Sequence, residues 1–519
     1  ENKHCCPMLS FLTRTPVLFR PQVSPSVVRL MSSSSSPKAH IPARALLFIN
    51  NECTETVGGS YYDLIDPTNE EVLCQATEAS ADDVEAAVQA AHAAFKDKAW
   101  RKMSAADRGL LLHRLADLME KNIEELSELE IRNSGKPYSE VRHWDLSASI
   151  SSIRFFAGAA DKITGKTIPA DPNHLVMTFR EPIGPCGVII PWNYPLEILC
   201  WKLGPCLAAG NTVVVKPSEQ TPLTALRLAE MAREVGFPKG VFNVVTGHGP
   251  TVGEALVKHP LISKVAFTGS TAVGHKVMSM CSEGKLKRLT LELGGKSPSI
   301  VFADADFQQA VDAAFMGLFA NQGQCCCAGS RVLVQDSIYT QFVEAVVAKA
   351  KSRKVGDPLD PTVEQGPMVH RAQFEKTLEY VEVGLEDGAT LAAGGKRHGK
   401  KGFFVEPTVF SDVTPNMRIA KEEIFGPVIT ILRFSTEEEA IEMANDTSYG
   451  LAGAVFTRDF GRAMRVSQEI KAGQVWINTY NAVFAQVPFG GYKESGLGRD
   501  LSEYALEHYT EVKAIVARL

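Results

Sequence analysis

Three consecutive thiols, Cys325, Cys326 and Cys327, follow a Gly–Gln pair just after a helical pattern ends. The small residues Gly323 and Ala328 flank them, so a substrate carbonyl can approach the backbone closely. Neighbouring side chains point apart in an irregular turn, so at most one thiol faces a given pocket. A nucleophile and a buried, inert cluster both stay open, because free cysteine packs like a small hydrophobe. Consecutive cysteines lack the separated spacing of a zinc site and do not easily form a disulfide with one another.

A glutamate upstream of the thiols favours the nucleophile. Glu292 lies in an apolar run that ends at Gly294 and Gly295. Burial tends to raise the pKa of a carboxyl group, and a raised pKa suits a general base that works near neutral pH. A thiol nucleophile together with a tuned glutamate is what the oxidation of a carbonyl through a thioester requires.

Further motifs follow one another along the chain, and together they resemble the aldehyde dehydrogenase superfamily over roughly residues 45–519. They are Leu-Glu-Leu-Gly-Gly-Lys at 291–296, Gly-Gln-Cys-Cys at 323–326, Pro-Trp-Asn-Tyr-Pro at 191–195, Lys-Pro-Ser-Glu at 216–219, Phe-Thr-Gly-Ser at 267–270, Glu-Glu-Ile-Phe-Gly-Pro at 422–427 and Pro-Phe-Gly-Gly at 488–491. The motifs are most similar to those of the broad-specificity cytosolic and mitochondrial enzymes, with some features of betaine-aldehyde dehydrogenases.

The resemblance implies roles for three catalytic residues. Cys326 attacks the aldehyde carbon, and the Asn193 amide stabilises the oxyanion together with the Cys326 backbone N–H. Glu292 then activates the water that hydrolyses the thioester. Relatives that pass the acyl group to coenzyme A generally lack this glutamate, so its presence favours hydrolysis. Asn193 also suits a plain turn former, since it lies between two prolines.

The resemblance also implies a site for NAD. A Gly-x-x-x-x-Gly segment follows a predicted strand and opens a helix, where backbone N–H groups hold a phosphate. The implied cofactor residues are Trp192, Lys216, Glu219, Gly269, Ser270, Gly274, Glu423 and Phe425. Lys216 and Glu219 would bind the adenosine ribose, and Glu423 the nicotinamide ribose. Because Glu219 would repel a 2′-phosphate, we expect NAD rather than NADP.

The substrate site is less well defined by the sequence. Family positions place four side chains near the substrate tunnel, namely Tyr194, Glu197, Trp201 and Phe489. The thiol triplet resembles that of enzymes that oxidise acetaldehyde, fatty aldehydes or retinal. The segment 193–198 instead resembles betaine-aldehyde and aminoaldehyde enzymes, whose aromatic faces suit a cationic ammonium group. No metal ion is expected.

Strands that alternate with helices predict the α/β class with parallel sheets. By resemblance, a Rossmann-like dinucleotide-binding domain comprises residues 37–163 and 183–294, and a second α/β domain with the thiol comprises residues 295–495. Residues 164–182 and 496–519 would form a small β oligomerisation arm that pairs across subunits, which implies a homotetramer (a dimer of dimers) or a homodimer. The hydrophobic patterns predict one helix over about 106–132, with leucines 110, 111, 112, 115 and 118 in the core, and another over 138–160.

The length, charge and cysteine content of the chain limit which classes of protein it can belong to. The chain has 519 residues, enough for two or more domains, and its net charge of −6 argues against a role on nucleic acid or a membrane surface. Its 11 cysteines form no disulfide framework, which suits a reducing compartment. Residues 2–51 contain arginines but no Asp or Glu, so residues 1–36 are expected to be a mitochondrial transit peptide that directs the protein to the matrix. A disordered tail on a cytoplasmic protein is the alternative.

Two other classes of protein remain as alternatives. One is a non-catalytic, crystallin-like protein on the same scaffold, which the complete set of Cys326, Glu292 and Asn193 argues against. The other is a cofactor-free cysteine hydrolase, which requires a histidine beside the thiol. None of the 12 histidines is placed there by a motif.

Overall fold

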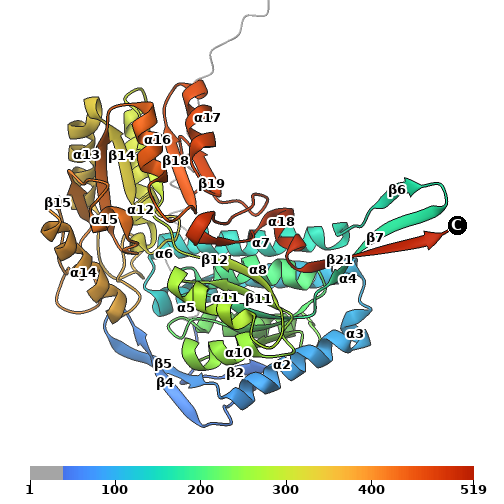
Figure 1. The fold of residues 1–519 in the computed structure, drawn as a ribbon. Helices are drawn as coiled ribbons and strands as arrows, with labels where there is room; N and C mark the ends of the chain where they lie inside the picture. The colour runs from blue at the N-terminus through green and yellow to red at the C-terminus, as the bar shows by residue number, and fades with distance from the viewer. Residues whose placement is uncertain (1–38) are drawn as a thin grey trace, which may run out of the picture. The chain divides into compact units, whose positions relative to one another are not determined.

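The computed structural model describes residues 39–519. The predicted transit peptide therefore lies outside the described residues. Two large sheets, each covered by helices, and a narrow β arm are visible in Figure 1. The arrangement is the predicted α/β class.

Five parallel strands form the centre of the eight-stranded sheet, in the order β12-β11-β8-β9-β10. They are β8 (Pro185–Ile189), β9 (Thr212–Lys216), β10 (Phe242–Val244), β11 (Lys264–Thr268) and β12 (Arg288–Glu292). The chain leaves β8 towards β9 and β10, and then returns to the other side of β8 as β11. The strand order therefore reverses between β8 and β11, and ligands of such sheets bind at the carboxyl ends of the strands at this point.

Both faces of this sheet are buried. Val213 and Val215 of β9 pack into one core and Val214 into the other, because successive side chains point to opposite faces. The helices of this part are α2 (Ala81–Lys96), α3 (Lys98–Arg101), α4 (Ala105–Lys121), α5 (Ile123–Ser134), α6 (Tyr138–Glu140), α7 (Leu146–Ala159), α8 (Pro195–Ala208), α9 (Leu223–Glu234), α10 (Glu254–Lys258), α11 (Thr271–Cys281) and α18 (Ser502–Glu507). Helices α4, α5, α7, α8 and α9 cover one face, and α2, α10 and α11 cover the other.

The seven-stranded sheet has the order β15-β16-β17-β14-β13-β18-β19, and only β15 runs antiparallel. Its strands are β13 (Pro298–Val301), β14 (Arg331–Gln335), β15 (Thr390–Ala393), β16 (Thr408–Ser411), β17 (Val428–Phe434), β18 (Ala452–Phe456) and β19 (Gln474–Ile477). Its helices are α12 (Phe307–Phe319), α13 (Tyr339–Ser352), α14 (Arg371–Glu386), α15 (Arg418–Lys421), α16 (Glu437–Asn445) and α17 (Phe460–Glu469). The thiols follow α12, as the sequence predicts.

Two of the predicted helices differ in detail. The helix over 106–132 is divided at Asn122, whose side-chain amide donates to the Leu118 carbonyl at 2.8 Å and competes with the helix backbone. Leu110 is exposed rather than in the core. The helix over 138–160 contains a π-helical segment, Val141–Asp145, which inserts a wider turn before α7.

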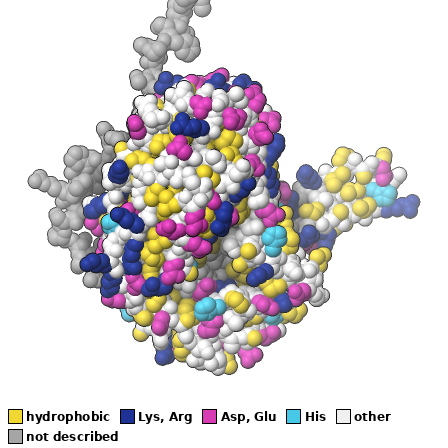
Figure 2. Space-filling model, turned by 60° about the vertical axis from the view of Figure 1, so that its left-hand side comes forward, with side chains coloured by type: hydrophobic (Ala, Val, Ile, Leu, Met, Phe, Trp, Pro, Cys, Tyr) yellow, Lys and Arg dark blue, Asp and Glu magenta, His cyan; other side chains and the backbone are white. Residues whose placement is uncertain are grey.

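The predicted arm is present, but its strands pair within one chain. β21 (Thr510–Arg518) pairs antiparallel with β7 (His174–Pro182), and β7 pairs with β6 (Thr167–Asp171). Within the described residues the tail and this segment therefore form one sheet of the order β21-β7-β6, in which β21 and β6 are the edge strands. Pairing of the arm across subunits stays a prediction. The arm projects from the body and carries hydrophobic side chains on its surface (Figure 2).

The C-terminal tail and the N-terminal strands extend the edges of the eight-stranded sheet and form a separate small sheet. β20 (Gly496–Leu497) pairs with β12, so the start of the 496–519 segment lies in the nucleotide-binding sheet and not in the arm. At the opposite edge of that sheet lie β2 (Leu47–Ile49) and β3 (Glu52–Thr54). A separate three-stranded sheet contains β1 (Arg44–Ala45), β4 (Ser60–Asp66) and β5 (Glu71–Glu78).

Candidate active site

The loop before the thiols has an unusual backbone. Asn321, Gln322 and Gly323 have positive φ angles of 48°, 57° and 73°. Non-glycine residues adopt this region only where the surroundings hold them there. At Gly323 a Cβ atom would lie 2.1 Å from the Gly426 carbonyl oxygen, so only glycine fits.

Hydrogen bonds from three directions hold this loop. The Asn321 backbone N–H donates to Glu140 Oε2 at 2.7 Å, and the Asn321 side chain donates to the Asn193 carbonyl at 2.8 Å. Gln324 Oε1 accepts from the Val369 N–H at 3.0 Å. The loop is therefore tied to the nucleotide-binding part of the chain as well as to its own domain.

The three thiols have different surroundings. Cys325 and Cys327 are buried with their sulfur atoms 3.5 Å apart, whereas Cys326 is partly exposed. Only Cys326 lines a cavity. Hydrogen bonding with Cys325, and burial, hold the pKa of the Cys326 thiol well above its ordinary value. The thiol is therefore protonated at neutral pH until a base removes the proton.

The cavity at Cys326 has a volume of about 210 Å³ and opens towards a longer groove of about 700 Å³. Asn193 and Glu423 also line the cavity, and Lys216 and Glu219 line the groove. The two spaces share the residues at the carboxyl ends of β8 and β11, namely Pro191, Trp192, Thr268, Gly269 and Ser270. A continuous cleft therefore runs from Lys216 to the thiol across the point where the strand order reverses.

The groove has the features of a nucleotide site. Ser270 caps α11, so the positive end of this helix faces the space where phosphates bind. Lys216 Nζ lies 3.6 Å from Glu219 Oε2. Gly274 does not line the groove: a Cβ atom there would lie 2.6 Å from Leu293, so this glycine lets α11 pack against the turn after β12. Because Gly274 is not among the residues that line the groove, the cofactor role of this glycine stays a prediction.

The predicted nicotinamide end lies beside the thiol. Glu423 Oε1 accepts from the Gly295 N–H at 2.9 Å, and burial raises the pKa of Glu423 to about 6. Trp192 and Phe425 contact each other edge to face, with ring centroids 5.2 Å apart. These side chains form one wall of the Cys326 cavity.

Glu292 ends β12 and is not brought into this cavity, although its chain neighbours Leu293 and Gly294 line it. Both carboxyl oxygens are buried, and neither has a hydrogen-bond partner among residues 39–519. The carboxyl lies against Gly490, where a Cβ atom would be 2.7 Å from Oε1. Burial, with Asp500 nearby, raises the pKa of Glu292 well above its ordinary value. The carboxyl thus lies one residue behind the cavity wall, and its raised pKa favours the protonated form.

A buried ion pair lies next to Glu292. Lys202 Nζ contacts Asp500 Oδ2 at 2.7 Å, and both side chains are shielded from solvent. Asp500 acts to raise the pKa of Glu292, whereas Lys202 and Arg499 act to lower it. The proton affinity of Glu292 therefore depends on this pair.

The predicted substrate side chains lie on the other side of the thiols. Trp201 and Phe489 contact each other with ring centroids 5.1 Å apart, in the core cluster that also contains Cys325 and Cys327. Tyr194 packs against this cluster, and Lys136 Nζ lies 3.3 Å from the centre of its ring. Glu197 is buried near Asp145 and Lys136, and its burial raises the pKa of this carboxyl well above its ordinary value.

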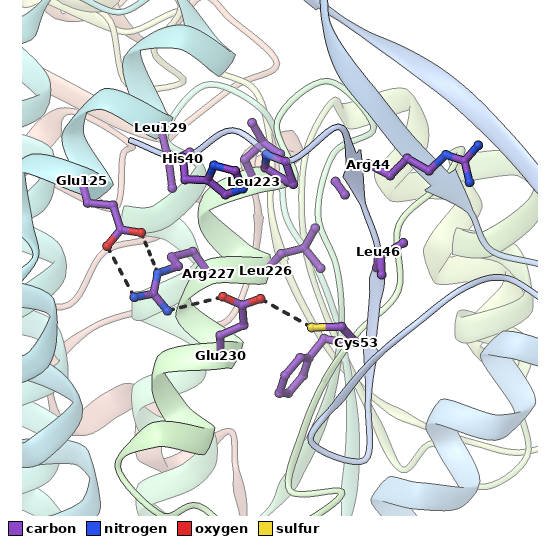
Figure 3. Close-up of a pocket in the computed structure, with 13 residues that line it drawn as sticks. His40, Arg44, Leu46, Cys53, Glu125, Leu129, Leu223, Leu226, Arg227 and Glu230 are labelled. Atoms are coloured by element: carbon purple, nitrogen blue, oxygen red, sulfur yellow. Dashed lines mark hydrogen bonds and ion pairs between the residues drawn. The ribbon is translucent and has the colours of Figure 1, made fainter. Parts of the chain in front are cut away.

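A separate cavity of about 350 Å³ contains another thiol (Figure 3). There Arg227 is held by Glu125 and Glu230, and the Cys53 sulfur lies 3.5 Å from Glu230 Oε1. Burial and the Glu230 charge raise the pKa of the Cys53 thiol. These surroundings disfavour the thiolate form of Cys53, so Cys53 is a poorer candidate for the nucleophile than Cys326.

Three residues of the cavity were missed by the sequence reasoning. His370, Gln373 and Lys376, at the start of α14, line the cavity together with Cys326. They follow no glycine-rich segment or apolar strand that would mark them. Only the periodicity of α14 was available, and it gives no sign that the first turn faces a cleft.

The part of the chain that the structure describes contains neither a metal-binding cluster nor a membrane-spanning helix. Residues 39–519 contain no group of three His, Cys, Asp or Glu side chains placed to hold a metal ion. Within the same range, no helix has the length and apolar character that a membrane span needs.

A partly exposed thiol at the end of a dinucleotide cleft, beside a carboxamide, defines the class of thiol-dependent dehydrogenases. The model of the "Aldehyde dehydrogenase family" matches residues 54–515, and the chain belongs to this family. It is similar to human "Retinaldehyde dehydrogenase 3", with 53% identity over 91% of this chain and 93% of the relative. It is also similar to "Aldehyde dehydrogenase, mitochondrial" from Rattus norvegicus, with 50% identity over 95% of this chain and 97% of the relative.

A solved relative has the same fold. The NAD+ complex of aldehyde dehydrogenase from Bacillus cereus superimposes with a TM-score of 0.91 and 46% identity, over 96% of this chain and 99% of that one. These matches confirm the predicted family, fold class, enzyme class and dinucleotide cofactor. The roles of individual residues and the domain bounds stay predictions.

Proposed function

We propose that the protein oxidises an aldehyde to the carboxylic acid with NAD, and that Cys326 is its nucleophile. The observation that carries the proposal is the single cavity that holds the Cys326 thiol, the Asn193 side chain and the inner end of the dinucleotide groove. A thiol without a cofactor cleft would suit a hydrolase, and a cleft without the thiol would suit a simple binding protein.

The first step is attack by Cys326. The thiol gives its proton to solvent water, the sulfur bonds to the aldehyde carbon, and the electron pair of the C=O π bond moves to the oxygen, which becomes an oxyanion. Among residues 39–519 no hydrogen bond from the Cys326 backbone N–H is found, so this donor is free for the oxyanion. Asn193 Nδ2 donates to the Gln324 carbonyl at 3.1 Å, which keeps the second donor beside the thiol loop.

NAD bound in the cleft accepts the hydride from the same carbon, and a thioester to Cys326 remains. Its hydrolysis requires a base that takes a proton from water. Glu292 suits this role because its carboxyl makes no hydrogen bond that would have to break before it turns. Glycine at position 490 leaves the space in which the carboxyl lies. Water then attacks the thioester carbon, the acid leaves, and the thiol is restored.

Lys216 and Glu219 support NAD over NADP. Lys216 is buried and its Nζ donates to the Pro217 carbonyl at 2.8 Å, which directs the ammonium group into the mouth of the groove. Glu219 accompanies it at 3.6 Å. A carboxylate here accepts hydrogen bonds from ribose hydroxyls and repels a phosphate at the same position.

A second candidate substrate class is favoured by Glu197. This side chain is only 8% exposed, and no hydrogen bond or ion pair to it is found among residues 39–519. The acidic neighbours of Glu197 have partners: Asp145 pairs with Lys136, and Glu140 lies 3.8 Å from Arg353. A substrate with an ammonium group would supply the counter-charge that Glu197 lacks, so aminoaldehydes or betaine aldehyde are the alternative to neutral aldehydes.

The arm supports a proposal about the oligomeric state, and the N-terminal segment supports one about the location of the protein in the cell. Exposed apolar side chains on the arm suit burial against further copies, in a homodimer or homotetramer; they are Ile168, Leu175, Phe179, Val512, Ile515 and Val516. The lack of acidic residues in 2–51 supports import into the mitochondrial matrix. Light scattering of the purified protein tests the oligomeric state, and import into isolated mitochondria tests the location.

One experiment tests the proposed function directly. The purified protein is assayed for NADH formation with neutral aldehydes of increasing length, and with 4-trimethylammoniobutanal against its uncharged isostere 5,5-dimethylhexanal. The proposal expects sustained NADH formation that needs both aldehyde and NAD. NAD binding without turnover on any aldehyde would contradict it, and would favour a non-catalytic protein. A kcat/KM that prefers the cationic aldehyde, and loses this preference in Glu197→Leu, would select the aminoaldehyde alternative.

A further inference from the structure

His370 lies at the place where the Cys326 cavity meets the nucleotide groove. Its ring contacts Trp192 edge to face, with centroids 5.6 Å apart, and Trp192 is one of the residues that both spaces share. In a bound dinucleotide the two phosphates join the adenosine half to the nicotinamide half. Because the groove takes the first half and the cavity the second, the phosphate on the nicotinamide side comes to lie beside this junction.

The N-cap of α14 fixes the hydrogen position on the ring. His370 Nδ1 accepts from the Gln373 backbone N–H at 3.1 Å. A ring nitrogen that accepts a hydrogen bond carries no hydrogen, so the neutral imidazole carries its hydrogen on Nε2. No partner for Nε2 is found among residues 39–519. The Nε2–H group of His370 is therefore available as a donor on the side of the ring away from the helix backbone.

Burial favours the neutral form of the ring. Burial lowers the pKa of His370 below its ordinary value, and Glu219 opposes this effect. The other charged or titratable groups of the cavity are Lys376 on α14, Glu423 before β17, and the Cys326 thiol. Lys376 Nζ is engaged with the Glu423 carbonyl at 3.0 Å. At neutral pH the ring therefore acts as an uncharged donor, and protonation would break its cap.

We propose that His370 binds the cofactor, with its Nε2–H donating to the phosphate on the nicotinamide side of NAD. The proposal rests on the proposed function, since it assumes that the cleft binds NAD. The first turn of α14 supports it, because the positive end of this helix also faces the cavity. His370 then completes a phosphate site between the N-termini of α14 and α11.

Two substitutions separate the cap from the donor. In His370→Asn the side-chain oxygen replaces Nδ1 as the acceptor at the N-cap, but the Nε2 donor is lost. In His370→Gln the amide nitrogen reaches the position of Nε2, but the cap is weakened. A purely structural role predicts that Asn is the milder change, whereas the proposed role predicts that Gln is the milder change for cofactor binding.

Calorimetric titration of the full protein measures the affinity of both variants for NAD. We expect His370→Asn to raise the Kd of NAD by about 10–150-fold, the worth of one hydrogen bond to a charged group, while His370→Gln stays close to wild type. ADP, which has the phosphate in question, should lose affinity in His370→Asn, and AMP, which lacks it, should not. Thermal unfolding should show the reverse order, with His370→Gln less stable than His370→Asn.

The outcomes distinguish this inference from the proposed function. Wild-type protein that binds no NAD would overturn both. Wild-type protein that binds NAD and oxidises aldehydes, with His370→Asn unchanged in its Kd for NAD and ADP, would overturn the role of His370 alone. Equal losses for AMP and ADP in His370→Asn would also overturn it, because the effect would then not depend on the second phosphate.

Discussion

Asn193 and Gln324 join the two parts of the active site: the Asn193 side-chain amide donates to the Gln324 main-chain carbonyl at 3.1 Å. Asn193 follows β8 of the nucleotide-binding sheet, and Gln324 immediately precedes the thiols of the other domain. The Asn321 amide reinforces the contact, since it donates to both the Asn193 and the Gln324 carbonyls. Movement of one domain against the other would therefore separate the proposed oxyanion donor from the nucleophile.

Asn193→Ala should lower kcat by about 10²–10³-fold, because one of two donors to the oxyanion is lost. The Kd of NAD should change little, since Asn193 is not among the residues that line the groove for the adenosine half. Stopped-flow measurement of NADH formation and calorimetric titration with NAD check the two parts. A lower unfolding temperature with full kcat would show instead that Asn193 only shapes its turn.

Cys326→Ser should abolish NADH formation, with a loss above about 10³-fold, because a serine hydroxyl is a far weaker acid than a thiol and does not lose its proton under the same conditions. Cys325→Ser and Cys327→Ser are matched controls, since both thiols are buried and neither lines the cavity. Both should keep turnover, and all three variants should still bind NAD. Loss of turnover in Cys325→Ser with retention in Cys326→Ser would reassign the nucleophile.

The sequence predicts the α/β class, the helical pattern that ends before the thiols and the order of the motifs, because apolar residues alternate or recur with a regular period in these segments. It does not predict the break at Asn122 or the π-helical segment before α7, since both depend on hydrogen bonds that override the 3.6-residue period. The packing role of Gly274 and the position of His370 also require the fold. Each depends on a contact between segments far apart in the chain, which no local pattern encodes.

Glu219→Gln should let the enzyme use NADP, with an increase of about tenfold or more in kcat/KM for NADP relative to NAD. The carboxylate would lie close to the 2′-phosphate, and two like charges about 4 Å apart near a protein surface repel by about 1–4 kcal/mol. Activity with NAD should fall only slightly, since the amide still accepts a hydrogen bond from the ribose. Steady-state rates with both cofactors measure the ratio. An unchanged ratio would place the discrimination elsewhere in the groove.

Glu292→Gln should form one equivalent of NADH rapidly and then almost stop, because hydride transfer precedes the hydrolysis that needs the base. In the wild type, hydrolysis requires ionised Glu292. Burial raises its pKa well above the ordinary value of 4.5, so turnover should rise with pH on the alkaline side of the usual carboxyl range. Rapid-quench and pH-rate measurements check both. A full steady-state rate in Glu292→Gln would show that another group activates water.

The Lys202–Asp500 ion pair should set the pH at which turnover rises, that is, the rising limb of the pH-rate profile. Lys202→Met removes a cation that lowers the pKa of Glu292, so the limb should move to higher pH. Asp500→Asn removes an anion that raises the same pKa and leaves Lys202 unpaired, so the limb should move to lower pH. Each change also breaks a buried ion pair, at about 3–5 kcal/mol of unfolding free energy, so the pH profiles are measured below the reduced unfolding temperature. Shifts in the same direction for both variants would mean that they act through altered packing and not through charge.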